Sequence, residues 1–310
     1  MTGSAVQQDE LGASVVIVTR DRAEALSRCL DALTMQEPGP DEIVVVRGNV
    51  DSCPESLLES FPSLSIRVVD CPEPNISAAR NLGIAHASYD IVLFIDDDAC
   101  ARPGWISAYM GVFSDHPHAW IAGGSVLDAR RSPPCPEFAC GMIHPTGRQR
   151  EVRPNGSSPP GSGFLDSVKG CNFAVHLGRM PSGLRFDPFF RFAFDESDLV
   201  LRVHASGGGV VHVPDCEVEH LHAPGRYRAD GVMDRDWLTE FASHTRFMRK
   251  HTRGMGRIHG VLVVGRRFCK HALRAVLAAA RGDVSPGRAR RCVCDALWGI
   301  MRGASFRGSV

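Results

Sequence analysis

The sequence predicts an α/β protein with a Rossmann-like, mostly parallel sheet, flanking helices and a basic helical extension at the C-terminus. First, short apolar runs alternate with amphipathic stretches over residues 14–122, a pattern typical of βαβ units. Second, the apolar run 91–95 ends in three consecutive carboxylates. Third, residues 246–310 hold 15 Lys and Arg but only two acids, which leaves 20 basic and 33 acidic residues before them.

The bulk properties are those of an ordinary globular protein. The chain has 310 residues, 44% apolar and 23% charged, enough for one large domain with an appendage. It lacks the run of ~20 apolar residues that a membrane-spanning helix needs. Residues 1–12 are polar, which predicts a flexible leader rather than a signal peptide. The 11 cysteines form no Cys-x-x-Cys pair, which indicates reduced thiols and a cytoplasmic location; a zinc site at Cys135, Cys140 and His144 is the weaker interpretation.

The first half of the chain divides into alternating strands and helices. Asp21 is expected to cap the first helix and Ser52 the second, each in a capping box. Apolar runs predict the strands, and an apolar stripe at helical spacing predicts the first helix. The expected strands are 14–18, 43–46, 66–69, 90–95 and 120–122, and the expected helices are 23–33, 54–61, 75–87 and 105–113.

The second half changes character after Val126. Residues 130–163 are rich in proline and glycine, and so long a loop is expected to be a mobile flap over the site rather than plain disorder. Order returns at 169–175 and 189–202, where acids crowd the first turn of a helix that begins at Asp195. Late strands are expected at 210–213 and 216–220, and helices from Trp237 onward.

The carboxylate triplet Asp96, Asp97 and Asp98 is the first candidate for chemistry. It follows a buried strand, and ligands of open α/β sheets bind beyond the carboxyl ends of such strands. Three adjacent negative charges repel one another, so a cation is expected there. Mg²⁺ or Mn²⁺ is the natural candidate because both prefer carboxylate oxygens. The alternative is a solvated acidic turn or the N-terminus of a helix.

Two further features have candidate roles. The pair Asp195 and Glu196 follows an aromatic-rich stretch, whose partly dry environment would raise a carboxyl pKa toward that of a general base. The alternative is ordinary helix capping. His220 can ligate Mn²⁺ as a neutral imidazole, and His222 would share its face of the strand; the alternative is a structural histidine.

Taken in order, these segments resemble the family 2 glycosyltransferases with the GT-A fold, over residues 14–222. The resemblance rests on the order of the motifs rather than on any one of them. They are Thr19-Arg20-Asp21-Arg22, Ser77-Ala78-Ala79-Arg80-Asn81-Leu82-Gly83, the Asp triplet, Lys169-Gly170-Cys171-Asn172-Phe173, Asp195-Glu196-Ser197-Asp198-Leu199 and the late His220.

The resemblance implies roles for the matching residues. Asp98 and His220 resemble direct metal ligands, and Asp96 resembles the residue at the donor ribose or the metal shell. Glu196 takes the position of the general base, while Asp198 and Arg202 hold its helix. The implied donor contacts are Thr19, Asp21, Arg22, Arg80, Asp96 and Asp97, and the implied substrate contacts are Asn172 and Asp195.

One position departs from the family pattern. The second strand is expected to end in acids that contact the nucleotide base, but here it ends in Val46-Arg47-Gly48. Because Arg47 replaces the expected acid, UDP cannot be assumed as the donor nucleotide.

The expected function is therefore an inverting, metal-dependent glycosyltransferase that uses Mn²⁺ or Mg²⁺. It would move a sugar from a nucleotide diphosphate sugar to an acceptor hydroxyl on a glycan, a lipid-linked molecule or a small molecule. A sugar nucleotidyltransferase is one alternative, but its glycine-rich phosphate loop is missing at residues 19–22. A non-catalytic nucleotide- or metal-binding protein is the other, and it would not need the Asp-Glu pair.

The resemblance and the charge pattern also suggest domain boundaries. Residues 13–236 would form the catalytic domain, with a nucleotide-binding half at 13–125 and an acceptor-binding half at 126–236. The basic region 237–310 either packs on that domain or docks on an anionic membrane, with residues 261–264 and 273–280 as a shallow apolar face. Nucleic acid is not an expected partner, because no aromatic interleaving accompanies the charge. The protein is expected to be cytoplasmic and, if the basic region docks on a membrane, peripheral at the inner face of that membrane.

Overall fold

The structure is a computed structural model that describes residues 12–137, 140–143, 149–152, 167–223, 236–252 and 254–305. The expected leader, residues 1–12, lies almost wholly outside these ranges. Much of the expected flap, residues 130–163, also lies outside these ranges. The described part of the flap contains short strands at residues 135–136, 140–143 and 149–152.

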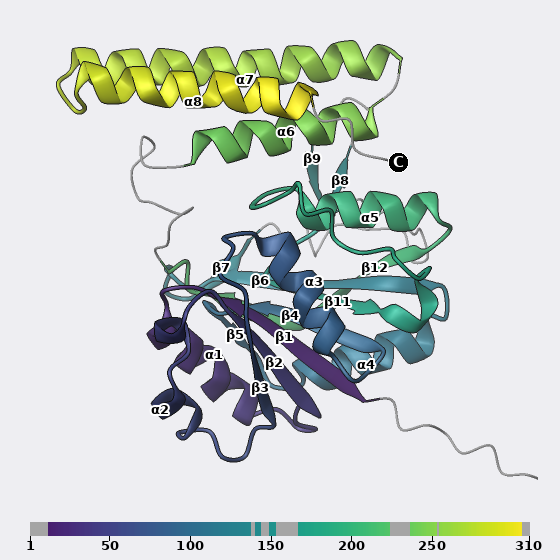
Figure 1. Ribbon diagram of the computed structural model, residues 1–310. Coiled ribbons are helices and arrows are strands. Elements are labelled where there is room, and N and C mark those ends of the chain that lie inside the picture. Colours follow the sequence, from purple (N-terminus) through teal and green to yellow (C-terminus); the bar gives the residue numbers. More distant parts are fainter. Residues whose placement is uncertain are drawn as a thin grey trace, which may run out of the picture.

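A nine-stranded mixed sheet forms the centre of the molecule (Figure 1), in the order β3-β2-β1-β4-β11-β6-β12-β5, with β7 paired to β6. Strands β3, β2, β1 and β4 are parallel, whereas β11 runs antiparallel between β4 and β6. Three further strands form a separate small sheet, β10-β8-β9. The strands of the main sheet are β1 (Ala13–Thr19), β2 (Glu42–Arg47), β3 (Ile66–Asp70), β4 (Ile91–Asp96), β5 (Ala99–Ala101), β6 (Ala119–Asp128), β7 (Cys135–Pro136), β11 (Asn172–His176) and β12 (Gly209–His220), and those of the small sheet are β8 (Cys140–Ile143), β9 (Gln149–Val152) and β10 (Ser167–Val168).

Continuous apolar runs form the central strands because both faces of the sheet are covered. Apart from Asp96, every residue of β4 is at most 2% exposed. The parallel register pairs Val18 with Asp96 and Thr19 with Arg47. The carboxyl ends of β1, β2 and β4 therefore meet at one edge, where ligands of such sheets bind.

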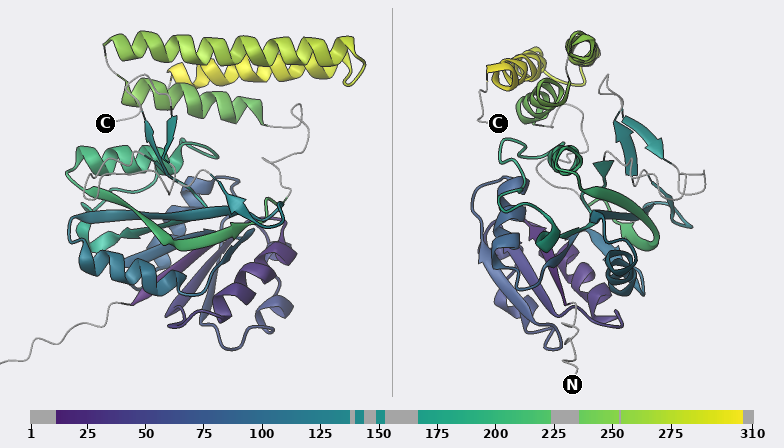
Figure 2. Two further views of the ribbon diagram at one scale, coloured as in Figure 1. Left: turned by 180° about the vertical axis from the view of Figure 1, so that it is seen from behind. Right: turned by 90° about the vertical axis from the view of Figure 1, so that its right-hand side faces the viewer.

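Helices lie on both sides of this sheet (Figure 2). Helix α3 packs on β1 and β2, and α4 packs on β6 and β12. The helices are α1 (Ala23–Thr34), α2 (Glu55–Leu58), α3 (Ile76–His86), α4 (Trp105–Asp115), α5 (Asp195–Ala205), α6 (Trp237–His251), α7 (Met255–Ala280) and α8 (Pro286–Ser305), with 3₁₀ turns η1 (Val50–Ser52) and η2 (Leu177–Arg179).

Both predicted capping boxes are wrong. Asp21 has a left-handed backbone with φ 58°, and the N-cap of α1 is Arg22, with no side-chain cap. The Asp21 carboxylate instead accepts a hydrogen bond from Asn49, 2.6 Å away. Ser52 lies inside η1, and α2 begins after Pro54. These side chains bind across neighbouring loops, and the local pattern contains no information about such contacts.

The predicted late strands are one strand, β12, with a register shift between Val213 and Glu217. The shift lets a single strand pair in parallel with β6 along its whole length and antiparallel with β5 at its end. It brings His220 beside Ala99, directly after the carboxylate triplet.

The C-terminal helices have a core of their own. Helix α6 lies between α5 and the outer pair α7 and α8 (Figures 1 and 2). Phe190, from the sheet domain, packs with α6 residues such as Phe241 and Phe247. The C-terminal region therefore packs on the rest of the chain through α6. Among the described residues, no helix combines the length and hydropathy needed to cross a membrane.

The junction of β6, β11 and β12 makes a prediction about stability. A Cβ on Gly124 would lie 2.2 Å from the Cys216 carbonyl oxygen and 2.3 Å from Asn172. Gly124→Ala should therefore lower the free energy of unfolding by about 1–3 kcal/mol, the usual cost of overpacking. Gly111→Ala is the control, because the new methyl on α4 meets nothing within 4 Å and should be neutral or stabilising. Urea denaturation measures both, and equal stability of the two variants would contradict the prediction.

Candidate functional site

A cavity of about 480 Å³ opens where the carboxyl ends of β1, β2 and β4 meet the N-terminus of α5. Its wall combines cationic side chains with carboxylates. The charged and hydroxyl groups that line it include Thr19, Arg20, Asp21, Arg22, Arg80, Asp96, Lys169, Asp195 and Glu196.

Arg80 connects the end of β4 to the start of α5 at the wall of this cavity. Its guanidinium donates a hydrogen bond to Asp195, donates to the Gly170 carbonyl oxygen at 2.7 Å and lies 3.5 Å from Asp96. It is also caged by aromatic rings, with its centre 5.3, 5.6 and 6.0 Å from the centroids of Phe173, Phe186 and Phe94. These rings attract a cation and exclude water from it.

Glu196 is the second residue of α5 and is half-buried at the cavity wall. Burial raises its pKa well above the usual range, the adjacent Asp195 raises the pKa further, and Arg80 opposes both. A carboxylate with such a raised pKa is a stronger base than an exposed one. The expected acid-rich first turn of α5 is confirmed, since Asp195, Glu196 and Asp198 all lie there.

The three carboxylates of the triplet lie in two environments, one at the cavity and one buried behind Arg22. Asp96 lines the cavity, whereas Asp97 and Asp98 are fully buried. Arg22 contacts both, at 2.6 Å from Asp97 and 3.2 Å from Asp98, and Thr19 donates to Asp97 at 2.8 Å. Burial raises the pKa of Asp97 to about 7, although Arg22 opposes the shift. Asp97 therefore connects the loop between β1 and α1 to the end of β4.

Asp96, Asp98 and His220 bring ligand atoms within 4.8 Å of one another. Two carboxylates and one imidazole suit Mn²⁺ in particular, and Mg²⁺ through the oxygens. The His220 ring is 1% exposed, with Nε2 3.5 Å from Asp98 Oδ1. The donor set therefore fits the expected divalent cation.

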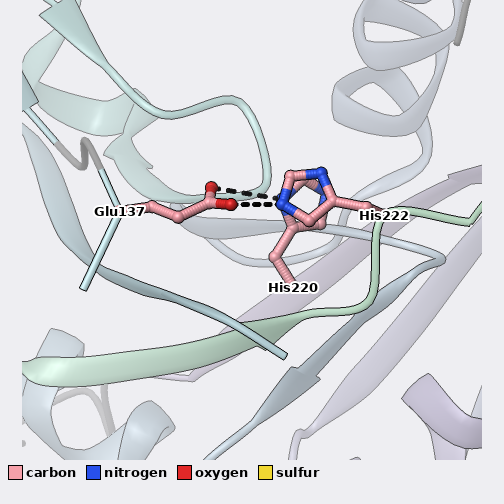
Figure 3. Close-up of side chains that lie close together, drawn as sticks. All are labelled: Glu137, His220 and His222. Atoms are coloured by element: carbon pink, nitrogen blue, oxygen red, sulfur yellow. Dashed lines mark hydrogen bonds and ion pairs between the residues drawn. The ribbon is translucent and has the colours of Figure 1, made fainter. Parts of the chain in front are cut away.

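Sequence reasoning missed one member of the site, Glu137. Figure 3 shows its carboxylate beside the rings of His220 and His222, and these three residues form a second group with metal-ligand spacing. Burial would raise the pKa of Glu137, but the nearby His220, His222 and Lys169 hold it at about 2. Glu137 lies in the proline-rich stretch after β6, where no periodicity or motif marks it.

Of the residues expected to contact the donor or the substrate, all but Asp97 and Asn172 line the cavity. Asp97 is bound behind it, as described above. Asn172 is fully buried, and its amide oxygen accepts from Trp105 and Tyr109, both at 2.8 Å. Its amide nitrogen donates to the carbonyl oxygens of Ser125 and Cys216, both at 2.7 Å. The side chain expected to contact the substrate is therefore used to tie α4 to the sheet.

Arg47, the departure from the family pattern, points away from the cavity wall. It pairs with Asp70 at 2.6 Å and donates to the Cys53 carbonyl oxygen at 2.9 Å. Its neighbours Val46 and Gly48 line the cavity instead, together with Arg20. No acid from the end of β2 therefore faces the part of the cavity where a nucleotide base is expected.

Backbone strain gathers at the same place. Among the described residues, three non-glycine residues have positive φ: Asp21 at 58°, Phe194 at 68° and His222 at 55°. Asp21 and Phe194 line the cavity, and His222 belongs to the cluster with Glu137. Such conformations cost of order 1–3 kcal/mol each and collect at functional sites.

The pKa of Glu196 predicts how stability depends on pH. A carboxyl group whose pKa is raised by folding binds its proton more tightly when folded, so wild-type stability falls as pH rises through the raised pKa. Glu196→Gln has no carboxyl group at this position, so its stability does not fall with pH for this reason. The difference in free energy of unfolding between this variant and wild type should therefore grow as pH rises above about 4.3, the usual pKa of a glutamate, as urea denaturation at several pH values would measure.

Glu59→Gln, at an exposed position after α2, is the control for a lost surface charge. A stability difference for Glu196→Gln that stays constant or reverses over this pH range would contradict the prediction.

Known proteins match both the sequence and the fold. The glycosyl transferase family 2 model matches residues 14–134. The glucosyl-dolichyl phosphate glucuronosyltransferase of Haloferax volcanii is 30% identical over 118 residues, which are 37% of this chain and 38% of that protein. The succinoglycan biosynthesis protein ExoM of Rhizobium meliloti is 24% identical over 83% of this chain and 86% of its own.

Among solved structures, a mannosyltransferase from Pyrobaculum calidifontis, in complex with GDP-Man and Mn²⁺, has a similar fold. Its TM-score is 0.54 at 13% identity, over 96% of this chain and 88% of that one. The expected α/β architecture of GT-A type is therefore confirmed. The likeness to the glycosyl transferase family 2 model itself covers residues 14–134, less than half of the chain.

Proposed function

We propose that the protein is an inverting, metal-dependent glycosyltransferase with Glu196 as its general base. The observation that carries this proposal is the bridge made by Arg80. It holds Asp96, at the candidate cation site, and Asp195, next to Glu196, on one cavity wall. An acceptor hydroxyl and a donor diphosphate could therefore be held in the same cavity.

In the proposed reaction, Glu196 accepts the proton of the acceptor hydroxyl while that oxygen attacks the anomeric carbon. The new bond forms on the face opposite the diphosphate, which leaves with the electron pair of the broken bond. General base catalysis contributes ~10²–10⁴-fold. Arg80 keeps Glu196 ionisable at the cavity wall, because its charge opposes the rise in the pKa.

The leaving diphosphate meets positive charge in the cavity. Arg20, Arg22 and Lys169 line it, and such cations stabilise charge that develops in the transition state. Asp96, Asp98 and His220 would hold Mn²⁺ or Mg²⁺, which when bound supplies further charge stabilisation at the diphosphate.

The donor is a nucleotide diphosphate sugar, and the acceptor carries a hydroxyl. The Pyrobaculum calidifontis enzyme holds GDP-Man, which supports a donor of this class. The direction of Arg47 leaves the nucleotide base open. Residues 13–236 would form the catalytic domain, with halves at 13–125 and 126–236, and residues 237–310 an accessory region.

The general base is tested by Glu196→Gln, which keeps the shape of the side chain but accepts no proton. We expect turnover to fall by about 10²–10⁴-fold, with donor affinity close to wild type. Release of nucleoside diphosphate from a panel of donors with Mn²⁺ measures turnover, and titration calorimetry measures donor binding.

Glu219→Gln is the matched control, because this half-buried carboxylate on β12 pairs with Arg102 outside the cavity. Near-normal turnover in Glu196→Gln would rule out Glu196 as the base. Donor binding without any diphosphate release by the wild type would favour a non-catalytic binding protein.

The outer face of α7 and α8 suggests where the enzyme works. Of the twelve exposed large hydrophobic side chains among the described residues, nine lie on these two helices. Their spacing of three and four residues places them on one face of each helix. They are Ile258, Val261, Leu262, Leu273, Val276, Leu277, Leu297, Trp298 and Met301.

Positive charge accompanies this apolar face. Arg266, Lys270 and Arg274 are exposed on α7 at intervals of four residues, so they form a stripe of their own along the helix. Apolar groups flanked by cations are typical of helices that lie in the headgroup region of an anionic membrane. We propose that α7 and α8 dock the enzyme on such a surface, which would favour a membrane-proximal or lipid-linked acceptor.

Replacing these three cations tests the docking. Each contributes ~1 kcal/mol near an anionic surface, so the triple variant Arg266→Gln, Lys270→Gln, Arg274→Gln should bind anionic vesicles on the order of 100-fold more weakly. Flotation with phosphatidylserine vesicles at low salt measures this. Trp298→Glu should also weaken binding, whereas Met35→Glu, at an exposed apolar position after α1, should not. A wild type that ignores these vesicles would overturn the docking but not the transferase.

A further inference from the structure

The two ring nitrogens of His220 face two different carboxylates. Nε2 lies 3.5 Å from Asp98 Oδ1, whereas Nδ1 lies 3.7 Å from Glu137 Oε2. The ring is 1% exposed, so bulk water does not decide where its proton lies. The neighbouring carboxylates do.

A neutral imidazole carries one N–H and one lone pair, and a metal can bind only the nitrogen with the lone pair. A proton on Nδ1 would point toward Glu137 Oε2, 3.7 Å away, and Nε2 would then present its lone pair toward Asp98. A proton on Nε2 would point toward the candidate cation site and block ligation by His220. The choice of tautomer therefore decides whether His220 can act as a ligand.

We propose that Glu137 is the positioning residue that fixes His220 in the Nδ1-protonated tautomer, and that His222 holds Glu137 in place for this role. The inference rests on the proposed function, because it assumes that Asp96, Asp98 and His220 hold a divalent cation. A carboxylate behind a metal-binding histidine orients the ring and makes it a stronger ligand.

Glu137 is well placed for this role because each of its oxygens has its own partners. Oε2 faces His220 Nδ1 and lies 3.7 Å from Lys169 Nζ. Oε1 accepts a hydrogen bond from His222 and lies 3.8 Å from Arg130. The backbone is also held, since the Glu137 N–H donates to the Val126 carbonyl oxygen at 2.8 Å. The carboxylate therefore keeps one oxygen directed at His220.

His222 reaches Glu137 through its left-handed backbone, φ 55°. This conformation lays the His222 ring against the His220 ring, with centroids 3.9 Å apart, and Figure 3 shows both rings at the same carboxylate. The next residue, Ala223, donates its N–H to Asp98 at 2.9 Å. The end of β12 thus contacts both sides of the candidate cation site.

A second cation site made of Glu137, His220 and His222 is the rival interpretation. It would need the lone pair of His220 Nδ1. Nε2 would then carry the proton, and His220 could not ligate a cation held by Asp96 and Asp98. Lys169 and Arg130 lie within 4 Å of the Glu137 carboxylate, and their charges disfavour a cation there. These charges therefore favour a positioning role for Glu137 behind His220 over a role as a metal ligand.

The experiment measures Mn²⁺ binding to the full-length protein by titration calorimetry, without donor or acceptor. Glu137→Leu should weaken Mn²⁺ binding by about 10–100-fold, as expected for the loss of a carboxylate behind a metal-binding histidine. Glu137→Gln keeps an oxygen that can accept from Nδ1 and should lose less. Glu219→Gln is the control, because Glu219 precedes His220 on β12 but pairs with Arg102.

A second measurement needs no metal. Long-range ¹H–¹⁵N spectra of histidine-labelled protein distinguish the two tautomers, and His220→Gln identifies the signal. Wild type should show the Nδ1-protonated form, and Glu137→Leu should lose it. Thermal denaturation checks that each variant is folded.

The outcomes separate this inference from the proposed function. Equal Mn²⁺ affinity in wild type and Glu137→Leu, or an Nε2-protonated His220 in wild type, overturns the role of Glu137 alone. A wild type that takes up no Mn²⁺ overturns the cation site of the proposed function and this inference with it. Mn²⁺ binding that survives Asp98→Asn but is lost in His222→Gln would place the ion in the rival site.

Discussion

The guanidinium of Arg80 is the constraint on which the rest of the site depends. It is 4% exposed and contacts Asp195, Asp96 and the Gly170 carbonyl oxygen, so one buried cation connects α3, the end of β4 and the start of α5. Removing one partner of a buried ion pair costs about 3–5 kcal/mol. Because burial and Asp195 both raise the pKa of Glu196 and Arg80 opposes them, this cation also sets the charge of the proposed base.

How far the sequence predicts the molecule depends on the kind of information each residue carries. The central strands were predictable because burial on both faces requires unbroken apolar runs such as that of β4. The ends of helices were not, because Asp21 and Ser52 bind partners in other loops. Motifs placed Asp97 and Asn172 near the site but say nothing of side-chain direction. Both side chains make buried hydrogen bonds within the fold, Asp97 with Thr19 and Asn172 with Trp105. Glu137 lies in a stretch without periodicity, so only the fold brings it to His220.

The basic C-terminal region has two distinct surfaces in the structure. Packing and membrane docking were alternative interpretations of the basic region, yet they concern different surfaces. Helix α6 supplies the packing, through Phe241 and Phe247 against Phe190. The outer face of α7 and α8 is left with the exposed apolar and cationic side chains. The position of α6 between α5 and this pair (Figure 1) means that one role does not exclude the other.

Asp198 has a consequence for how the gene can be divided. This carboxylate is fully buried in the first turn of α5 and accepts hydrogen bonds from Arg202 of its own helix and from His251 of α6, and it lies 2.7 Å from Lys250 of α6. Burial would raise its pKa, but these three partners hold it at about 2. A fragment that ends at residue 236 looks like a natural catalytic unit by its sequence. In such a fragment the ionised Asp198, two positions from Glu196, would lack two of its three partners, Lys250 and His251. Expression fragments of this protein should therefore extend through α6.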